Sequence, residues 1–138
     1  MENVGGRRIV AAALAVGVAG VDLLEKTFDV DALHHPRSAA ALALMAAVTA
    51  GLLTVVPRIP SWPVAIGAGV AAGGAIGNLV SGIVWWGAGV PDPLVVRAGA
   101  GGIAFNLADV FVLTGDVLLL SAATLHALRN RARLRQPV

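Results

Sequence analysis

The sequence predicts an all-α integral membrane protein: four transmembrane helices in a single domain, with both termini in the cytoplasm. Of the 138 residues, 57% are hydrophobic and only 13% are charged, and the mean hydropathy is +0.82. A soluble domain usually carries about a quarter charged residues. The composition therefore excludes a soluble enzyme and a disordered tail, and the absence of cysteine excludes a disulfide-stapled secreted domain. A net charge of only +2 argues against nucleic-acid binding.

Four apolar stretches predict the helices, because a helix needs about 20 apolar residues to cross a bilayer. The first stretch ends in a charged segment with Asp22, Glu25 and Lys26. Ser38 is a suitable N-cap for the second helix. A proline-rich turn at 57–63 follows that helix, and the long loop 87–102, which contains Asp92, precedes the fourth. Within the single domain 1–138, the expected helices cover about 9–28, 39–56, 64–86 and 103–128.

The arginines predict the orientation. With the N-terminus inside, seven of the ten basic residues fall on the inner side, and only Lys26, Arg37 and Arg97 fall outside. This distribution follows the positive-inside rule. We therefore expect a multi-pass protein of the cell (cytoplasmic) membrane.

Polar residues of three predicted helices meet at one depth, just below the outer surface. Asp22 and Lys26 are spaced i, i+4 and can pair on one helix face. Asn78 and Ser81 lie near the outer end of the third helix, and Asp109 lies near that of the fourth. An ionisable residue inside a span is costly and is a functional candidate by default. The alternative is a structural cluster that joins helices by hydrogen bonds.

Three other features carry weaker predictions. The third helix has a stripe of small residues, Gly69, Gly73, Gly77 and Ser81, that favours close helix packing. His34 and His35 are adjacent, but a metal site needs three or four converging ligands. We therefore expect interface solvation or proton sensing there, with no metal and no cofactor. Asp116 shares a helix face with Asp109 but lies about 10 Å deeper, so its participation stays open.

Three segments resemble the lipoprotein signal peptidases (signal peptidase II). Residues 73–80, Gly-Gly-Ala-Ile-Gly-Asn-Leu-Val, resemble the Gly-Gly-x-x-Gly-Asn-x-x segment of that family, and residues 105–109, Phe-Asn-Leu-Ala-Asp, resemble its Phe-Asn-x-Ala-Asp segment. Asp22 to Lys26 resembles the first-helix Asp-x-x-x-Lys. The resemblance implies an intramembrane aspartic endopeptidase that removes signal peptides from lipid-modified prolipoproteins. It implies a catalytic Asp109, with Asp22, Lys26, Asn78 and Asn106 binding substrate or supporting the site.

The sequence also departs from that family. Ser81 stands where the resemblance expects the first catalytic aspartate, and Gly82 stands where it expects arginine. The segment between the first two helices is short. The family's Val-Val-Asp-Phe segment is not matched, because Val95-Val96 is followed by Arg97. Loss of one acid–base group typically costs about 10²–10⁴-fold in rate.

Several interpretations follow from these departures. The protein is either an active divergent peptidase or a non-catalytic relative that binds a transmembrane peptide, a lipid or a membrane-complex partner. A Ser81 nucleophile with Lys26 as its base, and a small transporter or channel subunit, are remoter alternatives. The natural substrate and the oligomeric state stay open.

Overall fold

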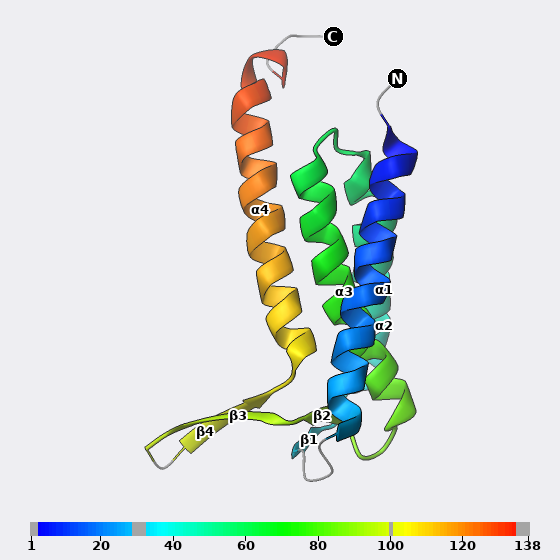
Figure 1. Cartoon of the computed structure of the whole chain (residues 1–138), viewed down its shortest axis with the longest axis vertical. Coiled ribbons are helices and arrows are strands. Elements are labelled where there is room, and N and C mark those ends of the chain that lie inside the picture. Colours follow the sequence, from blue (N-terminus) through cyan, green and yellow to red (C-terminus); the bar gives the residue numbers. More distant parts are fainter. Residues whose placement is uncertain (1–2, 29–32, 100, 135–138) are drawn as a thin grey trace.

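The structure is a computed structural model that describes residues 3–28, 33–99 and 101–134. Four helices run side by side, and α3 lies at the centre of the bundle, because α1, α2 and α4 all pack on it (Figure 1). Four short strands and one 3₁₀ turn connect the helices. In chain order the elements are α1 (Val4–Phe28), β1 (Leu33–His35), α2 (Ala39–Thr54), η1 (Val56–Arg58), α3 (Trp62–Val84), β2 (Val90–Asp92), β3 (Leu94–Ala98), β4 (Gly101–Phe105) and α4 (Leu107–Leu134).

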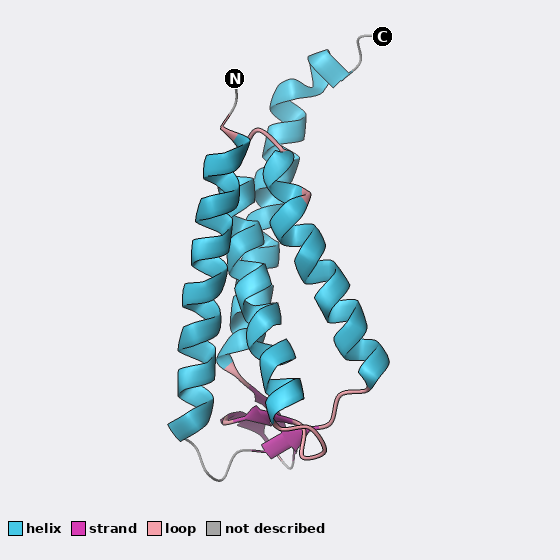
Figure 2. Cartoon of the chain, turned by 90° about the vertical axis from the view of Figure 1, so that its right-hand side faces the viewer, coloured by secondary structure: helices cyan, strands magenta, loops and turns pink. Residues whose placement is uncertain are grey.

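The strands gather at one end of the bundle, and both chain termini lie at the other (Figure 2). We call these the strand end and the terminal end. β1 pairs antiparallel with β2, with Leu33 opposite Asp92 and His35 opposite Val90. β3 and β4 form a separate antiparallel hairpin. The β1–β2 pair therefore ties the α1–α2 connection to the long α3–α4 connection.

The expected all-α class is corrected to a mostly helical fold with two small sheets. The fourth helix begins at Leu107 rather than at 103, because residues 101–105 pair with β3 as a strand. Among the described residues, three helical segments are long and apolar enough to cross a membrane: Ala39–Arg58, Trp62–Val84 and Leu107–Arg131. α1 has 25 residues and is not one of these three segments.

The small-residue stripe of α3 packs against α1 inside the bundle. A Cβ atom at Gly69 would lie 2.7 Å from the carbonyl oxygen of Ala11, and one at Gly73 would lie 2.6 Å from Cβ of Val18. Neither distance is compatible with a side chain, so the two helices approach more closely than any residue but glycine permits. The predicted close packing is confirmed.

Polar contacts hold both ends of α2. At its start, the Ser38 hydroxyl accepts a hydrogen bond from the Ala41 amide at 3.2 Å, which confirms the expected N-cap. At its end, Arg8 donates to the carbonyl oxygen of Thr54 and Arg7 to that of Pro57, each at 2.9 Å. The last carbonyls of a helix lack intrahelical donors, so Arg8 satisfies the last carbonyl of α2, and Arg7 holds the η1 turn that follows it.

Candidate functional site

A buried lysine organises the strand end of the bundle. The Lys26 Nζ atom lies 2.7 Å from Oδ2 of Asp22, 3.0 Å from Oδ1 of Asn78 and 3.1 Å from Oγ of Ser81. A lysine ammonium has three N–H donors and no acceptor, so these contacts use all of them. Lys26, Asp22 and Ser81 are all almost fully buried. The structure therefore brings together four of the residues that the sequence selected.

Ser81 makes two hydrogen bonds within the cluster. Its hydroxyl donates to the carbonyl oxygen of Gly77 at 2.7 Å and accepts from Lys26. Lys26 in turn pairs with the buried Asp22 side chain at 2.7 Å.

Asp22 joins α1 to the start of α4. Its Oδ1 atom accepts a hydrogen bond from the Ala108 amide at 2.7 Å, while its Oδ2 atom contacts Lys26. The first amides of a helix have no intrahelical acceptor, and a negative charge is favoured at that end of the helix. Both oxygens of the Asp22 carboxylate thus accept hydrogen bonds, and Asp22 links Lys26 to the start of α4.

Asn106 and Asp109 form a reciprocal cap at the start of α4. The Asn106 Oδ1 atom accepts from the Asp109 amide at 3.1 Å, and the Asp109 Oδ2 atom accepts from the Asn106 amide at 3.3 Å. This is the arrangement of a capping box, with asparagine and aspartate in the two positions. The other Asp109 oxygen accepts from Nδ2 of Asn78 at 2.8 Å. The Phe-Asn-x-Ala-Asp segment therefore fixes the orientation of the Asp109 carboxylate.

Asp92, a loop acid in the sequence analysis, supplies a second carboxylate beside this cap. It ends β2 and is only 3% exposed. Its Oδ1 atom accepts from Nδ2 of Asn106 at 2.5 Å, and its Oδ2 atom contacts Nδ1 of His35. One asparagine thus links the carboxylates of Asp92 and Asp109. The signal available in the sequence was an acid between two prolines, Pro91 and Pro93, shortly before the fourth helix.

The other acid and histidine candidates lie apart. Asp116 is exposed on α4, about 10 Å further along the helix than Asp109 at 1.5 Å per residue. His34 is exposed on β1. Within the described residues, no three His, Asp or Glu side chains gather in a way that could hold a metal ion.

A groove of about 530 Å³ between α2, α3 and α4 opens onto Asp109. Asp109, Asn78 and Arg37 make its polar part, and the remaining lining is apolar: Leu44, Met45, Val48, Ala75, Val112 and Leu113. Such a groove suits an apolar chain that brings one polar group to the carboxylate. Asp92 and Ser81 are not among its lining residues.

The family model described as signal peptidase (SPase) II matches residues 14–125, which is more than three quarters of the chain. No curated protein matches the sequence. The matched range extends from α1 to α4 and includes every residue of the cluster described above. The chain therefore belongs to the signal peptidase II family.

Proposed function

We propose that this membrane protein is an active aspartic endopeptidase that cleaves the signal peptide from a lipid-modified prolipoprotein, with Asp109 and Asp92 as its two acids. The observation that carries the proposal is the position of Asn106, whose side-chain amide donates to the Asp92 carboxylate and whose backbone amide donates to the Asp109 carboxylate. In this assignment the residue at position 81 is not required to be an acid. Ser81 instead accepts one of the three hydrogen bonds that Lys26 donates, and Lys26 joins α1 to α3 beside the two acids.

The chemistry needs two carboxyl groups in different protonation states. One carboxylate takes a proton from water as the oxygen attacks the scissile carbonyl carbon. The other, protonated, donates a hydrogen bond to the carbonyl oxygen; a proton then passes to the leaving nitrogen as the C–N bond breaks. Asp109 suits the first role, because both of its oxygens accept hydrogen bonds and it lines the groove. We assign the second role to Asp92, because the Asn106 side chain holds its carboxyl group beside the start of α4.

The groove supports a substrate that stays in the membrane. Its apolar walls on α2, α3 and α4 match the apolar core of a signal peptide, and Arg37 lies at its polar part. For this assignment we propose that α1 also crosses the bilayer, so that the protein has four spans with both termini in the cytoplasm. The side-by-side course of α1 and α3 supports this fourth span (Figure 1).

The test is cleavage of a diacylglyceryl-modified prolipoprotein by the purified protein in detergent. We expect Asp109→Asn and Asp92→Asn each to lower the rate by at least about 10²-fold, as for loss of a general acid or base. Ser81→Ala is expected to keep measurable cleavage. Asp116→Asn is the matched control on α4, because it removes an exposed acid that lies outside the cluster.

Two results would reject this proposal. If the wild type fails to cleave under conditions where a known family member does, the non-catalytic alternative gains support, with the groove binding a transmembrane peptide, a lipid or a membrane-complex partner. If Asp92→Asn cleaves at the wild-type rate, Asp92 is not the second acid. Activity that appears only in Ser81→Asp would show that the second catalytic acid belongs at position 81.

A further inference from the structure

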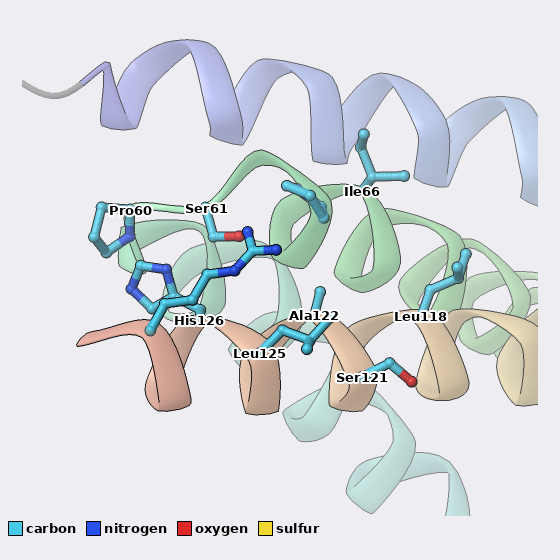
Figure 3. A pocket seen from close by; sticks show the side chains of 10 residues that line it. Pro60, Ser61, Ile66, Leu118, Ser121, Ala122, Leu125 and His126 are labelled. Carbon is cyan, nitrogen blue, oxygen red and sulfur yellow. The ribbon is translucent and has the colours of Figure 1, made fainter. Parts of the chain in front are cut away.

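A second cavity lies at the terminal end of the bundle, far from the carboxylates. It has a volume of about 630 Å³ and lies between the start of α3 and residues 118–129 of α4. Figure 3 shows its lining, with Ser61 and His126 towards one end, Ile66 and Leu118 towards the other, and Leu125 and Ala122 between them. The cavity is therefore amphipathic along its length.

The polar end of this cavity is cationic. Arg129 and His126 are spaced i, i+3 on one face of α4 and both line the cavity. Among the described residues, no carboxylate forms an ion pair with Arg129. Ser61 precedes α3 but does not cap it with its side chain, so its hydroxyl is not engaged by the helix. An arginine, a histidine and a hydroxyl at one end are the donors that bind a phosphate oxygen.

The apolar end explains why a soluble anion is not the best occupant. Ile66, Leu118 and Leu125 are all exposed, and they continue the cavity away from the basic end. In a bilayer such a surface is covered by an acyl chain. The volume falls within the roughly 300–1,000 Å³ of small-molecule sites, which is room for a headgroup and the first part of a chain rather than a whole lipid.

We infer that this cavity, which we call the α3–α4 terminal cavity, binds one anionic phospholipid such as phosphatidylglycerol. The phosphate lies against Arg129, His126 and Ser61, and the acyl chain continues along Leu125, Leu118 and Ile66. The basic residues around this end, which include Arg58 and Arg131, raise the local concentration of anionic lipid. Specific binding is assigned to Arg129, because Arg58 and Arg131 do not line the cavity.

Trp62 provides a local reporter, because it lies between two lining residues, Ser61 and Pro63. Replacement of Trp85 and Trp86 by phenylalanine leaves Trp62 as the sole tryptophan of the chain. This protein is reconstituted in vesicles of brominated phosphatidylcholine, which quenches its fluorescence. Unbrominated phosphatidylglycerol is then increased stepwise. Preferential binding restores fluorescence at a lower mole fraction than random mixing does.

We expect phosphatidylglycerol to be preferred over phosphatidylcholine by at least about fivefold, and the preference to fall to about one in Arg129→Gln. A fivefold to tenfold loss corresponds to one charge-assisted hydrogen bond. Arg131→Gln is the matched control, because it removes the same charge from α4 outside the cavity. Ala122→Phe fills the cavity and keeps all charges, and it should also abolish the preference.

Three outcomes would overturn the inference. Equal losses in Arg129→Gln and Arg131→Gln would show that only the surface charge attracts the lipid. An unchanged preference in Arg129→Gln, an exposed substitution that should not impair folding, would remove the headgroup site. Competition by sn-glycerol 3-phosphate at low millimolar concentration would show that the ligand is a soluble phosphate ester. Native mass spectrometry should find one retained phosphatidylglycerol, and a dimer or a bound peptide in its place would contradict the lipid assignment.

Discussion

Replacement of Lys26 by methionine tests the buried cluster most directly. The change removes three hydrogen bonds, to Asp22, Asn78 and Ser81, but keeps most of the side-chain volume. It leaves the Asp22 carboxylate, whose side chain is 0% exposed, without its counter-ion. Breaking a buried ion pair by removing one partner costs about 3–5 kcal/mol. We therefore expect Lys26→Met to lower the free energy of unfolding by about that amount.

The measurement is unfolding by SDS titration in mixed micelles, followed by pulse proteolysis. The double variant Asp22→Asn/Lys26→Met should recover about 2 kcal/mol relative to Lys26→Met, because it removes the uncompensated charge. The asparagine keeps an oxygen that can accept from the Ala108 amide. Arg8→Met is the control on the same helix, because it removes an exposed cation, and it should cost less than about 1 kcal/mol.

The reasoning fails if Lys26→Met costs less than about 1 kcal/mol, because the lysine would then not be the buried hub that its contacts describe. It also fails if the double variant loses the sum of the two single losses. Additivity of that kind is expected of residues that do not interact, which is incompatible with an ion pair of 2.7 Å.

Three further predictions concern packing, capping and the two acids. Gly77→Ala should destabilise the protein by about 2 kcal/mol or more, because the added methyl group would collide with the Asp22 carboxylate; Gly17→Ala, which meets open space on α1, should cost nothing in the same SDS titration, and equal costs would contradict the packing. Ser38→Ala should lower the free energy of unfolding by about 1 kcal/mol through loss of the α2 N-cap, and Ser38→Asp should restore it. Asn106→Ala should lower prolipoprotein cleavage by about tenfold or more although both acids remain, because Asp92 loses the hydrogen bond from the Asn106 side chain and the Asp109 backbone amide loses its cap; an unchanged rate would show that the Asn106 side chain does not position the two acids.

Features that depend on local spacing were predicted from the sequence. The Asp22–Lys26 pair follows from the i, i+4 rule and is present. Ser38 caps the helix that follows it. The recurrence of glycine every four residues predicted a closely packed face of α3, and α1 covers that face. Each of these depends only on residues within one or two helical turns.

Features that depend on distant pairing were not predicted. β1 has three residues and no alternating pattern, and it forms only because β2 lies beside it. That pairing brings His35 to Asp92 and buries an acid that the sequence places in an open loop. The start of the fourth helix was misplaced for a similar reason, because Gly101–Phe105 is apolar enough for a helix but pairs with β3.

The central place of α3 has a mechanical consequence. α4 is fixed to it by glycine-lined contact, in which a Cβ at Gly67 would lie 2.5 Å from the Leu119 amide. α2 packs mainly on α3 through larger side chains such as Leu42, and it takes no part in the Lys26 cluster. The wall of the groove that carries Asp109 is thus joined to α3 by close backbone contact, and the α2 wall is joined to it by side chains. We therefore expect an apolar chain wider than the groove to enter sideways from the bilayer by displacing α2, while Asp109 keeps its position.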